Sequence, residues 1–114
     1  MTNVIFFKKD GYYTGFTVSG HAMFNQKGKD IVCAAISVLT INTINALDEI
    51  NHESMDVDMD ENKGLLKMVL LSHKEESSQT LMKTLVLGLE SIQKEYGRKY
   101  CKVDYKEEDA NVKA

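Results

Sequence analysis

The chain has 114 residues and a mass of 12.9 kDa, which suits one domain and leaves no room for a second. Its 14 basic and 17 acidic side chains give a formal net charge of −3. This balance argues against a general nucleic-acid binder, because such a protein needs a basic face. With 43% hydrophobic and 27% charged residues, the composition excludes disordered and collagen-like classes. We expect one domain over residues 1–105 and a charged, frayed tail over residues 106–114.

The first part of the chain predicts a β-hairpin. Val4–Lys9 and Tyr13–Ser19 are strand-like, and Asp10-Gly11 between them is typical of a hairpin turn. In the second strand we expect Thr14, Phe16 and Val18 on one face, with Tyr13, Gly15, Thr17 and Ser19 on the other. A glycine in mid-strand indicates a bulge or a close backbone approach.

A long loop over residues 20–29 leads into a helix. Asp30 stands at the N-cap position of a predicted helix Ile31–Ile50. Apolar residues cover most of the circumference of this helix, which predicts that it is central to the core. Ser37 and several threonines and asparagines interrupt the apolar run, so we expect a buried helix and not a membrane span.

The second half of the chain repeats the pattern of two strands and a helix. The residues 52–60 and Leu65–Leu71 predict strands joined by a turn at residues 61–64. A second amphipathic helix follows, with Ser77 or Ser78 as its cap and Gly97 at its end. Arg98–Tyr105 predicts the last strand. The order β-β-α-β-β-α-β predicts a single α+β domain, in which two helices pack on one sheet.

His21 and Cys33 are the pair that best fits a chemical function. With Asp30 as N-cap, Cys33 lies in the first helical turn, where unpaired amides and the helix dipole favour a thiolate. A nearby imidazole lowers a thiol pKa further, and the same amides can hold an oxyanion. The plainer interpretation is a buried structural cysteine and a solvated histidine, because a spacing of twelve residues is not specific.

Two sequence blocks resemble the signature of a known family. Ser19-Gly20-His21-Ala22 and Asp30-Ile31-Val32-Cys33-Ala34-Ala35-Ile36-Ser37 are similar to the paired blocks of the ribosomal-processing cysteine proteases, called Prp. The loop length between the blocks and the order of strands and helices match as well. The resemblance covers nearly the whole domain, and the two blocks together are far more specific than either residue alone.

The resemblance implies a small cytoplasmic homodimeric endopeptidase. Such enzymes remove a short N-terminal extension from large ribosomal subunit protein twenty-seven, cutting after an aromatic residue. Carried over to this chain, Cys33 is the nucleophile and His21 the general base and acid. Residues 20–29, including Gly20, Ala22 and Gly28, would form a mobile loop that covers the bound peptide.

Two further residues have alternative roles. Asp30 either orients His21 or serves only as the helix cap. Ser37 lies one turn after Cys33 and either lines the site or bonds its hydroxyl to the preceding turn.

We expect no metal, cofactor or membrane partner. The three histidines and two cysteines lack zinc-ligand spacing. The alternating acidic residues 56–60 lack the glycine and the final glutamate of a calcium loop, so they predict the wet face of a strand. Cys101 shares a strand face with apolar residues and is expected in the core. Two cysteines and no signal peptide predict a cytoplasmic protein with reduced thiols.

Three functions remain to be compared. The favoured one is a cysteine endopeptidase that acts on a ribosomal precursor. A ribosome-associated module that grips a peptide without cutting it, and a subunit that acts only through its dimer face, are the alternatives. Thiol reactivity separates the first from the second, since only an activated Cys33 reacts rapidly near neutral pH.

Overall fold

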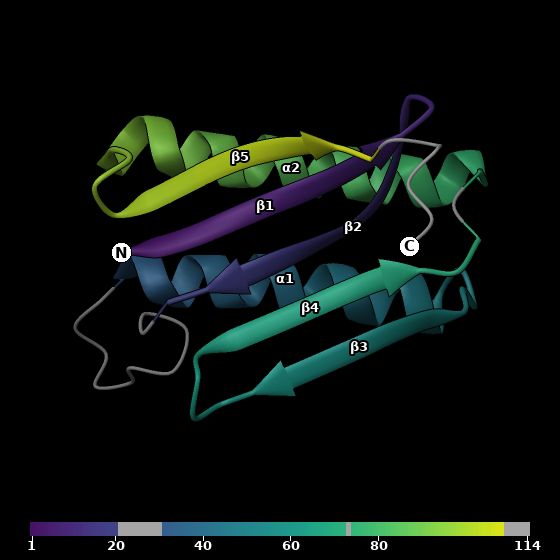
Figure 1. Cartoon of the computed structure of the whole chain (residues 1–114), viewed down its shortest axis with the longest axis horizontal. Helices are drawn as coiled ribbons and strands as arrows, with labels where there is room; N and C mark the ends of the chain where they lie inside the picture. The colour runs from purple at the N-terminus through teal and green to yellow at the C-terminus, as the bar shows by residue number, and fades with distance from the viewer. Residues whose placement is uncertain (21–30, 73, 109–114) are drawn as a thin grey trace.

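The structure, a computed structural model, describes residues 1–20, 31–72 and 74–108. Its elements follow the predicted order β-β-α-β-β-α-β (Figure 1). They are β1 (Thr2–Lys9), β2 (Tyr12–Ser19), α1 (Ile31–Glu49), β3 (Met55–Asp60), β4 (Leu65–Leu70), α2 (Glu76–Tyr96) and β5 (Cys101–Glu107). The predicted α+β class, with two helices packed on one sheet, is confirmed.

The sheet order is β3-β4-β2-β1-β5, and every neighbouring pair is antiparallel except β1 and β5. Both helices lie on the same face of the sheet (Figure 1). Helix α2 connects β4 to β5 across the sheet. A crossover connection of this kind is needed because β5 pairs in parallel with β1. The sheet therefore has one face covered by helices and one open face.

The core fills the layer between sheet and helices. Strand residues at alternate positions supply one side of it, and α1 and α2 supply the other. Its fully buried side chains include Val4, Phe6, Phe16, Val18, Ile36, Leu47, Leu66, Met68, Met82 and Leu89.

The glycine in the middle of β2, Gly15, indicated either a β-bulge or a close backbone approach, and a β-bulge lies beside it. Phe7 pairs with Gly15, but Lys8 pairs with Tyr13, so Thr14 is the extra residue of β2. The Thr14 hydroxyl donates to the Phe7 carbonyl oxygen at 3.2 Å. The bulge turns Tyr13 onto the helix face, where its ring meets Phe6 with centroids 5.8 Å apart. The expected placement of Tyr13 on the same face as Gly15 was wrong, because the extra residue resets the alternation.

Helix α1 is buried on one side only. Its buried residues are Val32, Cys33, Ile36, Thr40 and Leu47. Ile31 and Val38 are 63% and 66% exposed, so the expectation that α1 is central to the core was wrong. The helix is long and apolar enough to cross a membrane by length and composition alone. In the fold it packs its buried side against α2 and the sheet.

Several ends differ from the sequence-based boundaries. Helix α2 has Glu75 at its N-cap, and the buried Ser78 instead donates to Glu53 and accepts from the Asn51 amide at 3.0 Å. Gly97 ends α2 as predicted, with a φ of +100° and its N–H bonded to Gln93 O at 2.7 Å.

The two edge strands have shifted limits. Strand β3 begins at Met55 and not at His52, because His52 has a φ of +56°, which is not strand geometry. Strand β5 runs to Glu107, and the Glu108 N–H donates to Lys8 O at 2.6 Å. The expected tail from Lys106 onward therefore begins too early, since parallel pairing with β1 holds these residues in the sheet.

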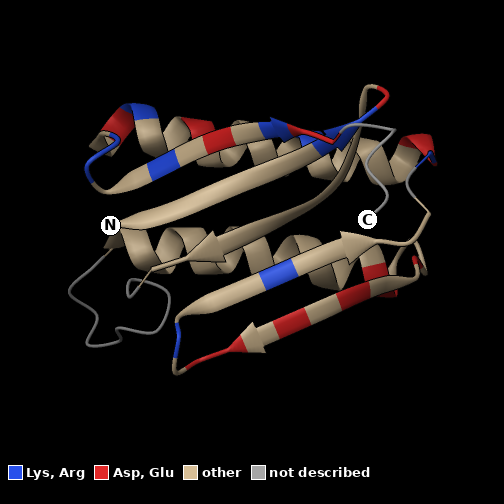
Figure 2. Ribbon diagram, in the orientation of Figure 1, with Lys and Arg blue, Asp and Glu red and all other residues tan. Residues whose placement is uncertain are grey.

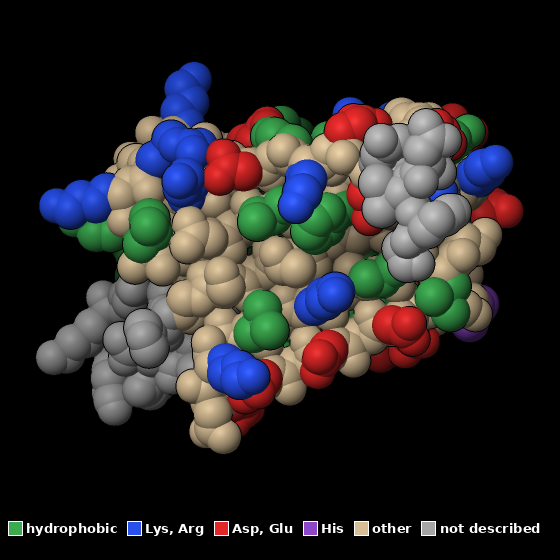
Figure 3. All heavy atoms as spheres, viewed as in Figure 1, with side chains coloured by type: hydrophobic (Ala, Val, Ile, Leu, Met, Phe, Trp, Pro, Cys, Tyr) green, Lys and Arg blue, Asp and Glu red, His purple; other side chains and the backbone are tan. Residues whose placement is uncertain are grey.

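The open face of the sheet carries apolar, polar and charged side chains. Figure 3 shows apolar side chains in its middle, with lysines and acidic residues among and around them. In the register of β3 and β4, Asp58 stands opposite Lys67 on this face. A solvated face of this mixed kind is normal for an antiparallel sheet.

We predict that Gly15→Ala destabilises the fold. A Cβ at this position would overlap the Met68 carbonyl oxygen and lie 3.1 Å from the Val69 Cα, so β2 and β4 would have to separate. We expect the free energy of unfolding, measured with urea, to fall by about 2–3 kcal/mol. Thr17→Ala, two residues along the same face of β2, is the control and should cost less than about 1 kcal/mol. Equal costs for the two variants would contradict the close approach.

Candidate active site

Cys33 lies in the first turn of α1, as the sequence predicts. It is the third residue of the helix and its side chain is 4% exposed. The first amides of an α-helix have no partner within the helix, and they make its start electropositive. Within α1, whose residues are all described, no acidic side chain stands in the first turn to offset this potential. The helix start therefore supplies Cys33 with an electropositive neighbourhood, which is the setting in which reactive thiols occur.

Gly20 fixes the point where the chain leaves the sheet. It follows β2 directly, has a φ of +131°, and donates its N–H to Gly64 O at 3.0 Å. A Cβ here would overlap the Met1 carbonyl oxygen and lie 3.1 Å from the Thr2 Cα. Both the backbone angle and the space therefore require glycine. The residue after it is His21, whose Cα is one peptide unit, about 3.8 Å, away.

The two elements on either side of the predicted loop, β2 and α1, border it at the same end of the molecule. The end of β2 and the start of α1 both lie near the N-terminus of the chain, at the same end of the sheet (Figure 1). His21, Ala22, Gly28 and Asp30 lie outside the described residues, so their predicted roles stay predictions. What the structure establishes is that the residues flanking them are held at the end of the sheet where the Cys33 turn begins.

Ser37 lies one turn further along α1 and lines a surface hollow of about 380 Å³. The same hollow is lined by Val38, Ile41, Asn42 and Asn45, all of α1. A separation of four residues places Ser37 about 40° around the helix from Cys33, so the two are on the same side. The two alternatives for Ser37, that it lines the active site or that its hydroxyl bonds to the preceding turn, both stay predictions.

Cys101 has the opposite environment from a reactive thiol. It is fully buried at the start of β5 and belongs to the core, as predicted. Burial raises the pKa of the Cys101 thiol, because the charged form loses solvation. Both cysteines of the chain are described, and both are thiols outside any disulfide. Only Cys33 combines a helix start with a position beside the loop.

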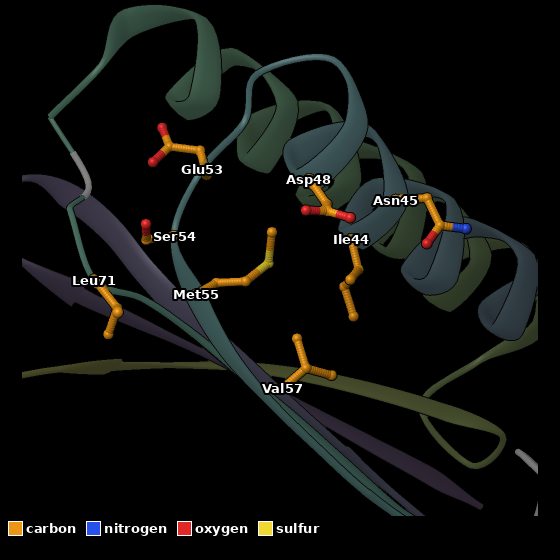
Figure 4. A pocket seen from close by; sticks show the side chains of 8 residues that line it. All are labelled: Ile44, Asn45, Asp48, Glu53, Ser54, Met55, Val57 and Leu71. Atoms are coloured by element: carbon orange, nitrogen blue, oxygen red, sulfur yellow. The ribbon is translucent and has the colours of Figure 1, made fainter.

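A second hollow was not predicted from the sequence. It has a volume of about 410 Å³ and lies between the second half of α1 and β3, with Ile44, Met55 and Val57 pointing into it (Figure 4). Two features of the sequence could have indicated this hollow. Residues 31–62 contain no Lys or Arg, and the outer face of α1 carries no charge before Asp48. Among residues 1–20, 31–72 and 74–108, no three His, Cys, Asp or Glu side chains are grouped to hold a metal ion.

Comparisons with known proteins agree with the two sequence blocks. The family model of cysteine protease Prp matches residues 1–102. The ribosomal processing cysteine protease Prp of Staphylococcus aureus (strain NCTC 8325 / PS 47) is 29% identical over 87 residues, which are 76% of this chain and 82% of that protein. The protein of the same name from Bacillus subtilis (strain 168) is 26% identical over 85 residues, 71% of this chain and 76% of the relative.

Solved structures show the same fold. The essential ribosomal processing protease Prp from S. aureus, in complex with a covalently linked product peptide, has a TM-score of 0.84 and 28% identity, covering 93% of this chain and all of that one. SMU.848 from Streptococcus mutans has a TM-score of 0.83 and 26% identity, covering 95% and 99% of the two chains. The chain belongs to the cysteine protease Prp family, and it is a cysteine peptidase.

Proposed function

We propose that this peptidase removes the N-terminal extension of large ribosomal subunit protein twenty-seven, a step needed for ribosome assembly. Cys33 is the nucleophile, and His21 is the general base and acid. The observation that carries the proposal is the position of Cys33 in the first turn of α1, at the end of the sheet where β2 also ends. The relatives named ribosomal processing cysteine proteases support the choice of substrate.

The reaction follows from the polarity of the helix start. The Cys33 thiolate attacks the scissile carbonyl carbon, and first-turn amides of α1 donate to the oxyanion that forms. His21, protonated after taking the thiol proton, gives that proton to the departing amine. Water, activated by His21, then attacks the thioester and releases the acyl part of the peptide with regeneration of Cys33.

The residues around the dyad have supporting roles in this proposal. Asp30, directly before α1, either orients the His21 imidazole or caps the helix. The segment of residues 20–29 covers the substrate peptide, with Gly20 as its fixed start and Ala22 and Gly28 within it. The S. aureus protein in complex with a substrate peptide supports an extended peptide as the ligand.

We also propose that the protein works in the cytoplasm as a homodimer. Two buried thiols in place of a disulfide suit a reducing compartment, and ribosomal proteins are processed where ribosomes assemble. The family resemblance supports the homodimer. A sedimentation experiment at micromolar concentration gives the oligomeric state directly.

One prediction of this proposal concerns cleavage of the substrate peptide. The test mixes the protein with a synthetic peptide that spans the extended N-terminus of the ribosomal protein and locates any cut by mass spectrometry. We expect one cut, and a loss of kcat/KM of at least about 100-fold in both Cys33→Ser and His21→Ala, because each variant removes a reacting group. Cys101→Ala, which changes the other thiol, should still cut. Binding of the peptide by the unaltered protein without any cut would exclude the proposal.

The second prediction concerns thiol reactivity. The raised pKa of Cys101 means that little thiolate is present at neutral pH, whereas the start of α1 favours the thiolate of Cys33. We expect iodoacetamide at pH 7 to modify Cys33 at least about tenfold faster than Cys101, as followed by peptide mapping. In urea the two rates should become equal. Similar slow rates in the folded protein would contradict an activated Cys33.

A further inference from the structure

Thr2 carries a buried hydroxyl that has no hydrogen-bond partner. Its side chain is fully buried at the start of β1, and among the described residues its Oγ1 is the buried side-chain nitrogen or oxygen atom left unpaired. Thr40, which is also fully buried, donates to Ile36 O at 2.8 Å. An unpaired buried hydroxyl destabilises a fold, and valine has the same shape without that cost. Packing alone therefore does not account for a threonine at position 2.

The Thr2 side chain points into the layer between the sheet and the helices. Thr2, Val4 and Phe6 alternate along β1 and are all fully buried, so they share the face that the helices cover. The backbone of Thr2 is fixed on both sides, by parallel pairing with Cys101 of β5 and by the close approach of Gly20. The hydroxyl is therefore held at the end of this layer where β1 begins.

The first turn of α1, which carries Cys33, lies at the same end of the layer. Strands β1 and β4 run in the same direction, because each is antiparallel to β2. The segment after α1 lies beside the end of β4, where Leu71 N–H donates to Ser54 O at 3.0 Å. Helix α1 therefore begins where β1 begins, as Figure 1 shows. Its first buried residues, Val32 and Cys33, are 7% and 4% exposed, so Cys33 and Thr2 are buried at one end of one layer.

Two sulfur atoms are the polar neighbours of Thr2 in this part of the core. The other buried polar side chains of the described residues belong to later turns of α1, to the bulge of β2 or to the start of α2. Burial raises the pKa of the Cys101 thiol, so this sulfur stays protonated and is a weak acceptor. Cys33 is the thiol that the proposed function ionises, and a thiolate is a much stronger acceptor than a thiol. Ionisation of Cys33 therefore creates the partner that the Thr2 hydroxyl lacks.

Few charges stand around this end of the layer. Figure 2 shows no charged residue in the first part of β1 or of α1. The buried residues in the second half of α2, Leu89 and Ile92, are uncharged as well. The Met1 amine is at the chain end, where Met1 is 61% exposed, and His21, which the proposed function pairs with Cys33, lies outside the described residues. In surroundings with so few charges, one neutral donor changes the stability of a thiolate measurably.

We infer that Thr2 is a positioning residue of the active site, whose hydroxyl donates a hydrogen bond to the Cys33 sulfur when this sulfur becomes a thiolate. In the structure the hydroxyl is unpaired, as expected beside a neutral thiol. Rotation about the Thr2 Cα–Cβ bond turns it toward the charged sulfur. The hydrogen bond holds and stabilises the thiolate, and the threonine keeps its proton. This inference rests on the proposed function, because it takes Cys33 as the nucleophile.

The test removes the hydroxyl and keeps the shape of the side chain. Thr2→Val does so, Thr2→Ser keeps the hydroxyl, and Thr40→Val removes a buried hydroxyl that is already bonded. Iodoacetamide is the probe, and peptide mapping follows the modification of Cys33 separately from that of Cys101. The rate is measured over a wide range of pH without any peptide substrate, so that the result does not depend on cleavage.

We expect Thr2→Val to raise the apparent pKa of Cys33 by about 0.5–1 unit, because the thiolate loses a donor. Its modification at pH 7 should slow about three- to tenfold. Thr2→Ser and Thr40→Val should stay within about twofold of the unaltered protein. In urea, Thr2→Val should unfold at the same or a higher concentration, since it removes an unpaired buried hydroxyl. With the ribosomal peptide, Thr2→Val should lower kcat and leave KM within about twofold.

Each outcome separates the inference from its alternatives. An unchanged pH profile in Thr2→Val would overturn it and leave the hydroxyl without a part in the reaction. Equal slowing in Thr2→Val and Thr2→Ser would also overturn it, because the shape of the side chain and not the hydroxyl would then matter. If Thr2→Val does not fold, Thr2→Ala against Thr2→Ser makes the same comparison. A shifted profile with a peptide that is never cut supports the role of Thr2 and excludes the proposed function.

Discussion

The close backbone contact at the end of the sheet is the constraint on which the site depends. Gly20 lies so near Met1 and Thr2 that no side chain fits, and its N–H is bonded to Gly64. This contact fixes the place where β2 ends and the loop of residues 21–30 begins. Burial of Val32 and Ile36 fixes the other flank, because these residues hold the start of α1 against the core. The residues on both sides of positions 21–30 are therefore held by rigid backbone at the same end of the sheet.

Helix α1 has two properties that come from the same absence of charge. The first turn of α1 contains no acidic residue, so none of its own side chains opposes the positive potential of the helix start at Cys33. Without Lys, Arg, Asp or Glu on its outer face before Asp48, the helix leaves an apolar surface beside β3. An ordinary surface helix would lose both features. The uncharged sequence of α1 therefore determines both the potential at the start of the helix and the character of its outer surface.

The predictable part of the structure is the part set by local periodicity. Alternation along β3 and β5, and the glycines at positions 15 and 97, placed these strands, the close approach and the end of α2. The face of Tyr13 was missed, because a bulge depends on how two strands pair and not on either strand alone. The exposed side of α1 was missed for a similar reason: apolar periodicity shows that a face is to be covered, but not by what. The position of Cys33 in the first turn of α1 was predicted correctly, because the start of a helix has a local sequence signature.

The acidic residues near β3 need two explanations, and only one of them is structural. Asp56 and Asp58 alternate with Val57 on an edge strand, where charge prevents pairing with another chain. Asp48 and Glu53 are not in the strand, so edge protection does not account for them. Glu53 has a structural partner in Ser78, which ties the start of α2 to the end of α1. Asp48 lies above an apolar depression and near a helix end, where a negative charge is unfavourable. Asp48 is therefore unfavourable for its own helix, and neither edge protection nor a tie between elements gives it a structural role.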